Sequence, residues 1–389
     1  ASVVVTNFGQ DSSFAGNKTA QGNQDGNDIG DFYYTPPTGF LALCTSNLPE
    51  PDVQPAETFN TVLWTGNGSS DHSITGVGFQ PDLTWTAERT STSANHLFDA
   101  VRDYNGLYTN STSAESDQSA MGGPDSDGFT VGVSGGYNES NQTYCAWNWK
   151  FNGSGSANTD GSINTTATSV NVSAGLSMST YTGNSTSGAT VGHGLSQAPD
   201  FVMCKRRSNT GNWTIFWNNT ETSDPETDFW RLDETGAVAD SNTRWNDTAP
   251  TATVFSLGDS VDVNANSNTY VAYCFHNVDG FSKMGYYEGN GNDDGAFIYT
   301  GFRPAWVMTK EVSGSNYWHI MDNKRSPSNP VNDHLKANDS AAEDTNNAGF
   351  VLDFVSNGFK WRDADHDNQA ATYIFMAFAE TPFKYANAR

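Results

Sequence analysis

The sequence is poor in positive charge and has no long apolar run. Of its 389 residues only 19 are Lys or Arg, against 44 Asp or Glu, which gives a formal net charge of -25. Such a field repels nucleic-acid phosphates and anionic membrane surfaces, so we expect no nucleic-acid partner. No apolar run approaches the roughly eighteen residues of a membrane-spanning helix, so we expect no membrane insertion.

Cysteine is also scarce, and the few cysteines do not form a motif. Cys44, Cys145, Cys204 and Cys274 contain no C-x-x-C pair, so a zinc or redox motif is not expected. We expect free thiols that are mostly buried.

Motifs for catalysis are missing as well. The chain has no G-x-S-x-G, no H-E-x-x-H and no Walker loop. A carboxylate pair of the glycosidase kind remains open, because acidic residues are plentiful and such pairing is spatial. We predict that the protein is not an enzyme.

What the sequence does have is aromatic residues and turn formers. Aromatics reach 13% of the chain, and Gly, Asn, Ser, Thr and Asp fill much of the rest, with little Leu, Lys or Glu. This usage disfavours helices and favours turns and strands. The composition therefore predicts an all-β protein with several aromatic-rich cores.

The most informative feature is an internal repeat, in which five short blocks recur three times in the same order. The opening blocks are Trp64–Asn67, Tyr181–Asn184 and Tyr287–Asn290; the blocks entered by proline are Pro81–Trp85, Pro199–Met203 and Pro304–Met308; the closing blocks are Thr143–Trp149, Thr269–Phe275 and Thr372–Phe378. The period of roughly 105 to 125 residues is too long for a solenoid or a propeller blade, so each copy should be a whole domain or half of a large one. Period-two alternation within the blocks predicts antiparallel β-sandwiches of jelly-roll or concanavalin-like type.

The repeat divides the chain into four parts. Residues 1–58 are expected to be an N-terminal β segment, opening in a strand at Val3–Val5, followed by a proline-rich connector. Copy 1 spans 59–153, a linker and copy 2 span 154–283, and copy 3 spans 284–389. Within the linker, the polar alternating stretch Ile163–Val172 is a candidate extra strand.

Two sets of residues are candidates for binding. Tryptophans outside the shared blocks are candidates for an exposed sugar-stacking face, with core or interface residues as the alternative: Trp213, Trp217, Trp230, Trp245 and Trp361. Hard oxygen ligands on two short loops make calcium the one cofactor worth testing, although Asx turns explain both loops equally well: Asn292, Asp293, Asp294, Asp363, Asp365 and Asp367.

Several stretches resemble virion structural proteins of marine tailed bacteriophages, of the tail-fibre or head-fibre type. The matching stretches are Phe79–Trp85, Ala146–Lys150, Gly194–Leu195 with Ala198–Phe201, Tyr299–Pro304 and Pro382–Arg389. Asn7–Gln10 and Gly30–Pro37 through Cys44 look like the end of a SPRY-type sandwich. The resemblance implies no catalytic residues.

That resemblance implies a non-enzymatic virion protein, a fibre or capsid-decorating protein on the particle surface, which attaches to a host or stabilises the capsid. Expected partners are other virion proteins, a host-surface glycan and two further copies in a homotrimer, although the three copies could instead supply pseudo-symmetry within one chain. Two alternatives remain: a secreted or cell-surface lectin-like module that binds polysaccharide, and a polysaccharide-degrading tailspike.

Overall fold

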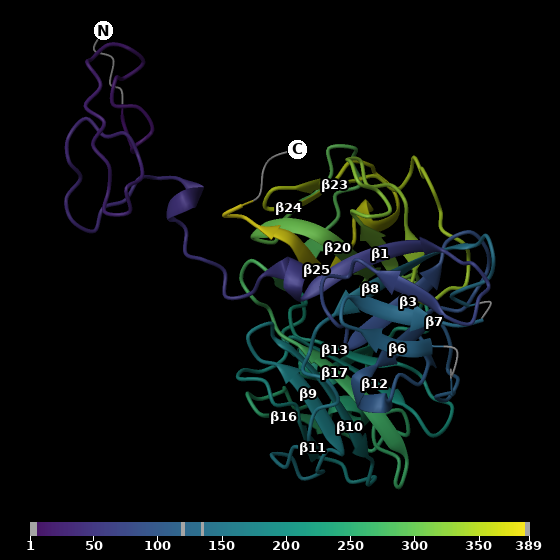
Figure 1. The fold of residues 1–389 in the computed structure, drawn as a ribbon. Helices are drawn as coiled ribbons and strands as arrows, with labels where there is room; N and C mark the ends of the chain where they lie inside the picture. Colours follow the sequence, from purple (N-terminus) through teal and green to yellow (C-terminus); the bar gives the residue numbers. More distant parts are fainter. Residues whose placement is uncertain (1–5, 118–120, 134–135, 386–389) are drawn as a thin grey trace.

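A computed structural model describes residues 6–117, 121–133 and 136–385, and they form an antiparallel, almost entirely β protein (Figure 1). The predicted all-β sandwich class is confirmed. Helical structure is confined to short turns: η1 (Thr45–Asn47), η2 (Pro55–Glu57), η3 (Ala100–Arg102), η4 (Pro225–Thr227), α1 (Asn242–Trp245) and η5 (His366–Asn368). Over these described ranges, no helix has the length and apolar character needed to cross a bilayer.

Unit 1, residues 59–149, is a sandwich of a large and a small sheet. The large sheet has the order β1-β8-β3-β4-β5. Its strands are β1 (Phe59–Thr65), β8 (Thr143–Trp149), β3 (Leu83–Glu88), β4 (His96–Asp99) and β5 (Leu107–Tyr108). The small sheet, β2-β7-β6, contains β2 (His72–Thr75), β7 (Gly128–Val131) and β6 (Met121–Asp125).

Unit 2, residues 167–275, has the same arrangement with one strand added at each edge. Its large sheet runs β15-β14-β13-β12-β17-β10-β9. The strands are β9 (Ala167–Asn171), β10 (Leu176–Thr182), β12 (Phe201–Arg206), β13 (Thr214–Trp217), β14 (Asp228–Arg231), β15 (Ala239–Asp240) and β17 (Thr269–Phe275). The small sheet pairs β11 (Ala189–Gly192) with β16 (Val254–Leu257), and β9 confirms the extra strand expected in the linker.

Unit 3, residues 282–382, begins slightly earlier than the predicted boundary at 284. Its large sheet, β18-β25-β20-β21-β22, contains β18 (Ser282–Glu288), β25 (Thr372–Pro382), β20 (Phe302–Glu311), β21 (His319–Asp322) and β22 (Leu335–Lys336). The small sheet, β19-β24-β23, contains β19 (Phe297–Tyr299), β24 (Gly358–Trp361) and β23 (Leu352–Val355).

The three large sheets share one strand order and one register. Leu83 pairs with both Trp149 and Asp99, Phe201 with both Phe275 and Trp217, and Trp306 with both Phe378 and Asp322. Residues of the three units can therefore be matched position by position.

The glycine of each opening block is required by a close approach between loops. In each unit a closing strand, formed by the closing block, follows one of these loops: β8, β17 and β25. A Cβ on Gly66, Gly183 or Gly289 would lie 2.1, 2.5 or 2.1 Å from a backbone oxygen of the loop before that strand. A buried asparagine of that loop then accepts a hydrogen bond from the residue after the glycine, at 3.0, 2.9 and 3.3 Å: Asn138, Asn264 and Asn368. The recurring Gly-Asn dipeptide thus fixes the same loop contact in each unit.

Every large sheet is buried on both faces. Its outer face packs on the small sheet of its own unit, and the inner faces of all three sheets meet in one shared core. Trp147, Tyr273 and Met376 occupy matching positions in that core. The bulky residues on both faces of the closing strands are explained by this second layer of packing.

The units form a closed ring in which the same contacts recur at each junction. The backbone N–H of Glu343 donates to Arg89 O at 2.9 Å, that of Glu115 to Arg207 O at 2.9 Å, and that of Val238 to Val312 O at 2.8 Å. The side-chain N–H of Asn95, Trp213 and Trp318 donates to the carbonyl of Lys336, Tyr108 and Arg231, at 2.8, 2.8 and 3.0 Å. These contacts define a pseudo-threefold arrangement within one chain.

Two of the three junctions carry buried charge. Between units 1 and 3, Trp147 Nε1 donates to Asp322 at 3.0 Å, and Asp322 pairs with Arg325 at 2.6 Å. Between units 2 and 1, the Tyr273 hydroxyl donates to Asp99, and Asp99 pairs with Arg102 at 2.7 Å. Burial alone would raise the pKa of Asp322, but Arg325 and the hydrogen bonds from Trp147 and Arg325 hold it below its usual value.

Residues 6–52 form an arm that projects from the ring, whereas Val53 lies in the shared core and η2 packs against β1 and β25 (Figure 1). The β segment expected there is not formed by the described residues, which contain only an isolated bridge between Asn23 and Phe32. Side chains take the backbone donors that a ladder would use: the Asp25 carboxylate accepts from the N–H of Ala42 at 2.7 Å and of Ile29 at 3.1 Å. The strand expected at Val3–Val5 lies outside the described residues.

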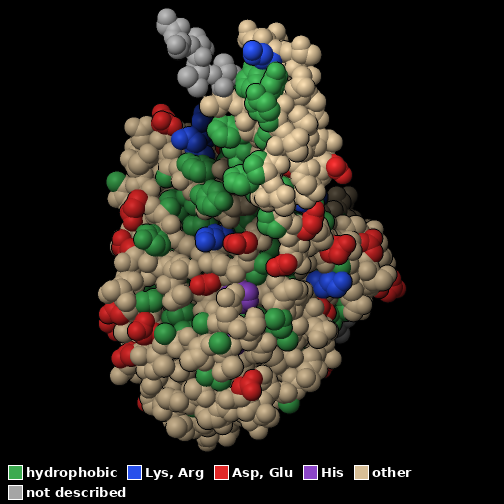
Figure 2. All heavy atoms as spheres, turned by 90° about the vertical axis from the view of Figure 1, so that its left-hand side faces the viewer, with side chains coloured by type: hydrophobic (Ala, Val, Ile, Leu, Met, Phe, Trp, Pro, Cys, Tyr) green, Lys and Arg blue, Asp and Glu red, His purple; other side chains and the backbone are tan. Residues whose placement is uncertain are grey.

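Large apolar side chains are exposed along the arm, and apolar side chains continue over the adjoining face of the ring (Figure 2). The exposed large apolar residues of the arm are Phe8, Tyr34, Phe40, Leu41, Leu43 and Leu48. The exposed thiol of Cys44 also lies in the arm, whereas Cys145, Cys204 and Cys274 are buried and unpaired. The prediction of free, mostly buried thiols is confirmed.

Candidate functional site: the open edge of unit 3

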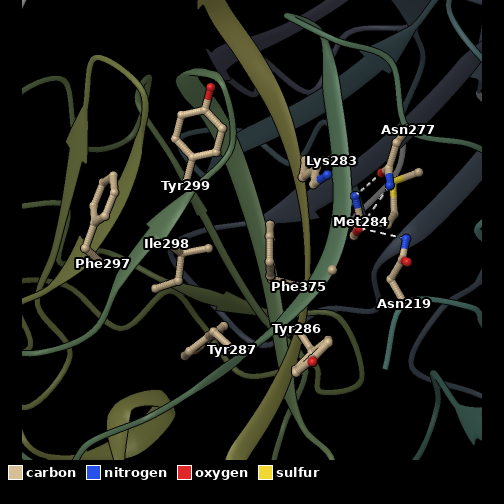
Figure 3. A pocket seen from close by; sticks show the side chains of 11 residues that line it. Asn219, Asn277, Lys283, Met284, Tyr286, Tyr287, Phe297, Ile298, Tyr299 and Phe375 are labelled. Atoms are coloured by element: carbon tan, nitrogen blue, oxygen red, sulfur yellow. Dashed lines mark hydrogen bonds between the residues drawn. The ribbon is translucent and has the colours of Figure 1, made fainter. Parts of the chain in front are cut away.

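A groove of about 360 Å³ lies where the two sheets of unit 3 end, between the edge strands β18 and β19 (Figure 3). Three aromatic side chains line it while remaining solvent-exposed: Tyr286 at 47%, Phe297 at 48% and Tyr299 at 62%. Exposed rings of this size on two neighbouring edge strands are unusual for a surface that meets only water.

The floor of the groove belongs to the core of unit 3. Tyr287, Ile298 and Phe375 are buried and also line the groove. Because successive side chains in a strand point to opposite faces, Tyr287 and Ile298 turn inward while their neighbours Tyr286, Phe297 and Tyr299 turn outward. The groove is therefore the unfilled mouth of the sandwich.

One end of the groove is polar. Asn277 Nδ2 donates to the carbonyl of Met284 at 3.3 Å, and the Met284 N–H donates to Asn277 Oδ1 at 2.5 Å. Asn219 Nδ2 also donates to Met284 O at 3.3 Å. Lys283 adds a cation, and no acidic side chain lines the groove although the chain is strongly acidic overall.

The corresponding mouths of the other two units are covered, although β1 of unit 1 is an edge strand like β18. In unit 2, β9 pairs along β10, so Thr180, which matches Tyr286, is 2% exposed. In unit 1, the Asn60 amide donates across the mouth to Gly76 O at 3.2 Å and Val77 O at 3.0 Å. The open mouth is thus specific to unit 3.

The tryptophans predicted to form a sugar-stacking face do not form one. All five are 2% exposed or less: Trp213, Trp217 and Trp230 lie in the shared core, Trp245 in the core of unit 2 and Trp361 in that of unit 3. The alternative, that these tryptophans are core or interface residues, is confirmed, because sequence outside the repeated blocks packs both between units and within them. A buried indole cannot stack on a sugar from solvent.

The predicted calcium ligands lie on two loops that the structure does bring together, through Asn368. Its amide donates to Asn292 O at 3.0 Å and to Asp363 O at 2.6 Å. The carboxylates do not converge, and the described residues contain no group of three or more His, Cys, Asp or Glu side chains placed to hold a metal.

Those side chains have protein partners or face solvent instead. Asp294 pairs with Lys360 at 2.8 Å, Asp293 is exposed, and Asp365 donates its N–H to Asp363 at 3.0 Å. Burial raises the pKa of Asp363 to about 6, and buried Asp367 lies 3.0 Å from His319 Nδ1. The Asx-turn interpretation fits Asn292, whose side chain accepts from the Asp294 N–H at 2.9 Å.

Sequence reasoning did not select the residues of the groove. Tyr286 and Phe297 flank the opening block of copy 3, and their matches are Leu63 and Ser73 in unit 1 and Thr180 and Thr190 in unit 2. An aromatic residue present in one copy alone, beside a shared block, was the available signal.

The fold and groove define a class: a single-chain, pseudo-threefold ring of β-sandwiches with a groove at the edge of unit 3. The chain belongs to the family described as Domain of unknown function (DUF7483), whose model matches residues 54–382. That span covers all three units and leaves out the arm. Neither the curated proteins nor the solved structures contain a match.

Proposed function

We propose that the protein is a non-enzymatic structural protein of a phage virion, a fibre or capsid-decorating protein on the particle surface. The observation that carries the proposal is the closed ring, in which three sandwiches share one core and repeat the same junction contacts. Such a ring is a rigid body that gives one chain the outline of a trimer. The resemblance of its sequence to tail and head fibres supports the same role.

The ring also changes what is expected of a homotrimer and of binding to the host or the capsid. A pseudo-threefold chain can occupy a threefold position on a particle without forming a homotrimer, and it presents its loops and open edge outward. Host attachment or capsid stabilisation would then depend on many copies acting together, through effective concentration.

The test is imaging and mass spectrometry of intact particles from a host that produces this chain. Cryo-electron microscopy should show a ring-shaped density on the head or the tail, and quantitative mass spectrometry should give its copy number. Hundreds of copies would indicate decoration of the capsid, and a few would indicate a fibre. Absence of the chain from purified particles would overturn the proposal.

The lectin-like alternative is favoured by one specific observation, the three exposed rings of Tyr286, Phe297 and Tyr299. Aromatic faces of this kind bind the apolar faces of sugars. Binding to a glycan array by the chain free of particles, lost on Tyr299→Ala, is the result that this alternative predicts.

A further inference from the structure

We propose that the open edge of unit 3 accepts an extended, uncharged segment of another protein, which adds a strand to β18 and fills the mouth of the sandwich. The proposal concerns this edge alone and does not depend on the protein being found on a particle. It follows from what occupies the same place in unit 2.

Unit 2 shows that the edge geometry accommodates an added chain. Residues 162–171 cover both of its edge strands: β9 pairs along β10, and the Ile163 N–H donates to Thr190 O of β11 at 2.9 Å. Ile163 is 7% exposed and packs into the core of unit 2. A short extended segment with one aliphatic side chain thus closes the mouth.

Unit 3 lacks such a segment because β18 begins at Ser282, a few residues after β17 ends at Phe275. The turn between them leaves too little chain to run along the edge. The result is the groove, with the core residues Tyr287, Ile298 and Phe375 at its floor.

The edge of β18 is available for hydrogen bonding beyond Met284. The Asn277 amide both donates to and accepts from Met284, which is the pair of bonds that a neighbouring strand would make. Backbone groups of alternate residues in a strand point the same way, so the N–H and C=O of Tyr286 and Glu288 also face outward. A partner strand can continue from where Asn277 stops.

The chemistry of the groove indicates the kind of segment. Its floor is apolar, its walls are aromatic, and its charged lining residue is Lys283, so an uncharged or mildly acidic segment with an inward aliphatic residue fits best. The segment that closes unit 2, Ser162–Asn171, likewise contains no charged residue. A second copy is disfavoured because two chains of charge -25 repel each other.

The probe is a library of random twelve-residue peptides, selected on the full chain. Enriched peptides should share a short alternating pattern with uncharged residues and an aliphatic anchor. They should bind the Tyr286→Pro variant at least about tenfold more weakly, because proline removes the outward N–H of β18. The matched control is Leu63→Pro, at the corresponding exposed edge of unit 1, which should leave binding unchanged.

A second measurement leaves the protein unaltered, in case Tyr286→Pro does not fold. Methylating alternate backbone nitrogens of the best peptide should abolish its binding while its side chains stay the same. No enrichment in the selection, or equal binding of the methylated peptide, overturns the proposal.

Two further outcomes would assign the edge to a different occupant and also overturn it. One is binding to a glycan array that Tyr299→Ala abolishes and Tyr286→Pro does not. The other is a wild-type dimer in sedimentation experiments that Tyr286→Pro dissociates.

Discussion

The three junctions of the ring make the same backbone contacts with different side chains. Arg89 meets Glu343 and Arg207 meets Glu115 at two junctions, and the matching residues at the third are Val312 and Val238. The buried aspartates of units 1 and 3, Asp99 and Asp322, have the apolar residue Trp217 at the same position of unit 2. The backbone geometry therefore sets the ring, and either an ionic set or an apolar set of side chains completes it.

The difference also shows that each set works as a whole. A buried carboxylate loses its hydration, and at the ionic junctions an arginine and an N–H or O–H donor compensate that loss, while a second carboxylate pairs with the other side of the arginine. The junction between units 2 and 3 has none of these charged groups and is complete without them. A junction that keeps only some of the charged groups should therefore lower the stability of the protein, which the following predictions test.

The largest effect is expected from Arg325→Met. The Arg325 side chain is fully buried and lies 2.6 Å from Asp322 and 2.8 Å from Glu343. Its loss leaves buried Asp322 without a countercharge and leaves Glu343 with Arg89 alone, which should lower the free energy of unfolding by about 3–5 kcal/mol in urea titrations. Adding Asp322→Leu should restore part of that loss; a double variant less stable than the single one would contradict the idea of a set.

The next effect is a dependence on pH from His96, at a position where unit 2 has no titratable side chain. Burial lowers the pKa of His96 from 6.5 to about 4, and its match in unit 2 is Thr214. As pH falls from 6.5 toward 4, the unfolded chain takes up a proton that the folded chain does not, so this site should lose about 3 kcal/mol of stability.

His96→Thr copies unit 2 into unit 1 and should flatten the dependence. The measurement is the urea midpoint of wild type and variant at several pH values from 7 to 4. The quantity to compare is the slope with pH, since the substitution also changes packing. Equal slopes would show that His96 is not the group responsible.

A third test removes one donor from an ionic junction. Trp147→Phe leaves Asp322 without the indole N–H at 3.0 Å and should cost about 2 kcal/mol, measured by circular dichroism in urea. Trp85→Phe is the control, because Trp85 lies in the same core and its Nε1 has no partner. Equal losses in both variants would mean that packing, and not the hydrogen bond, determines the cost.

How far the sequence predicts this molecule depends on which contacts are local. The Gly-Asn turns, the alternating strands and the extra strand before copy 2 follow from neighbouring residues, and the structure has them. The alternating pattern of bulky residues shows that both faces of the closing strands are buried. It does not show that the second face packs against the other two units, so the ring cannot be predicted from the sequence.

The binding candidates failed for the same reason. Trp213 and Trp230 lie outside the repeated blocks, which suggested exposure, yet those segments are where one unit meets the next. The groove was missed because it depends on β18 being an edge strand with no chain beside it. Strand order at an edge is a property of the whole chain, and its one local trace is an aromatic residue, Tyr286, where the other copies have Leu63 and Thr180.

The smallest expected effect comes from converting the apolar junction into an ionic one. Val312→Arg and Val238→Glu place a guanidinium and a carboxylate where the other junctions have them. Val312 is 3% exposed, so a single charge there lacks a partner and each single variant should be destabilised. The double variant should recover about 1 kcal/mol relative to the sum of the singles, measured as a double-mutant cycle in urea. Strict additivity would mean that the Arg–Glu contacts at the other two junctions depend on the neighbouring Asp–Arg pair, and that the backbone alone does not position them.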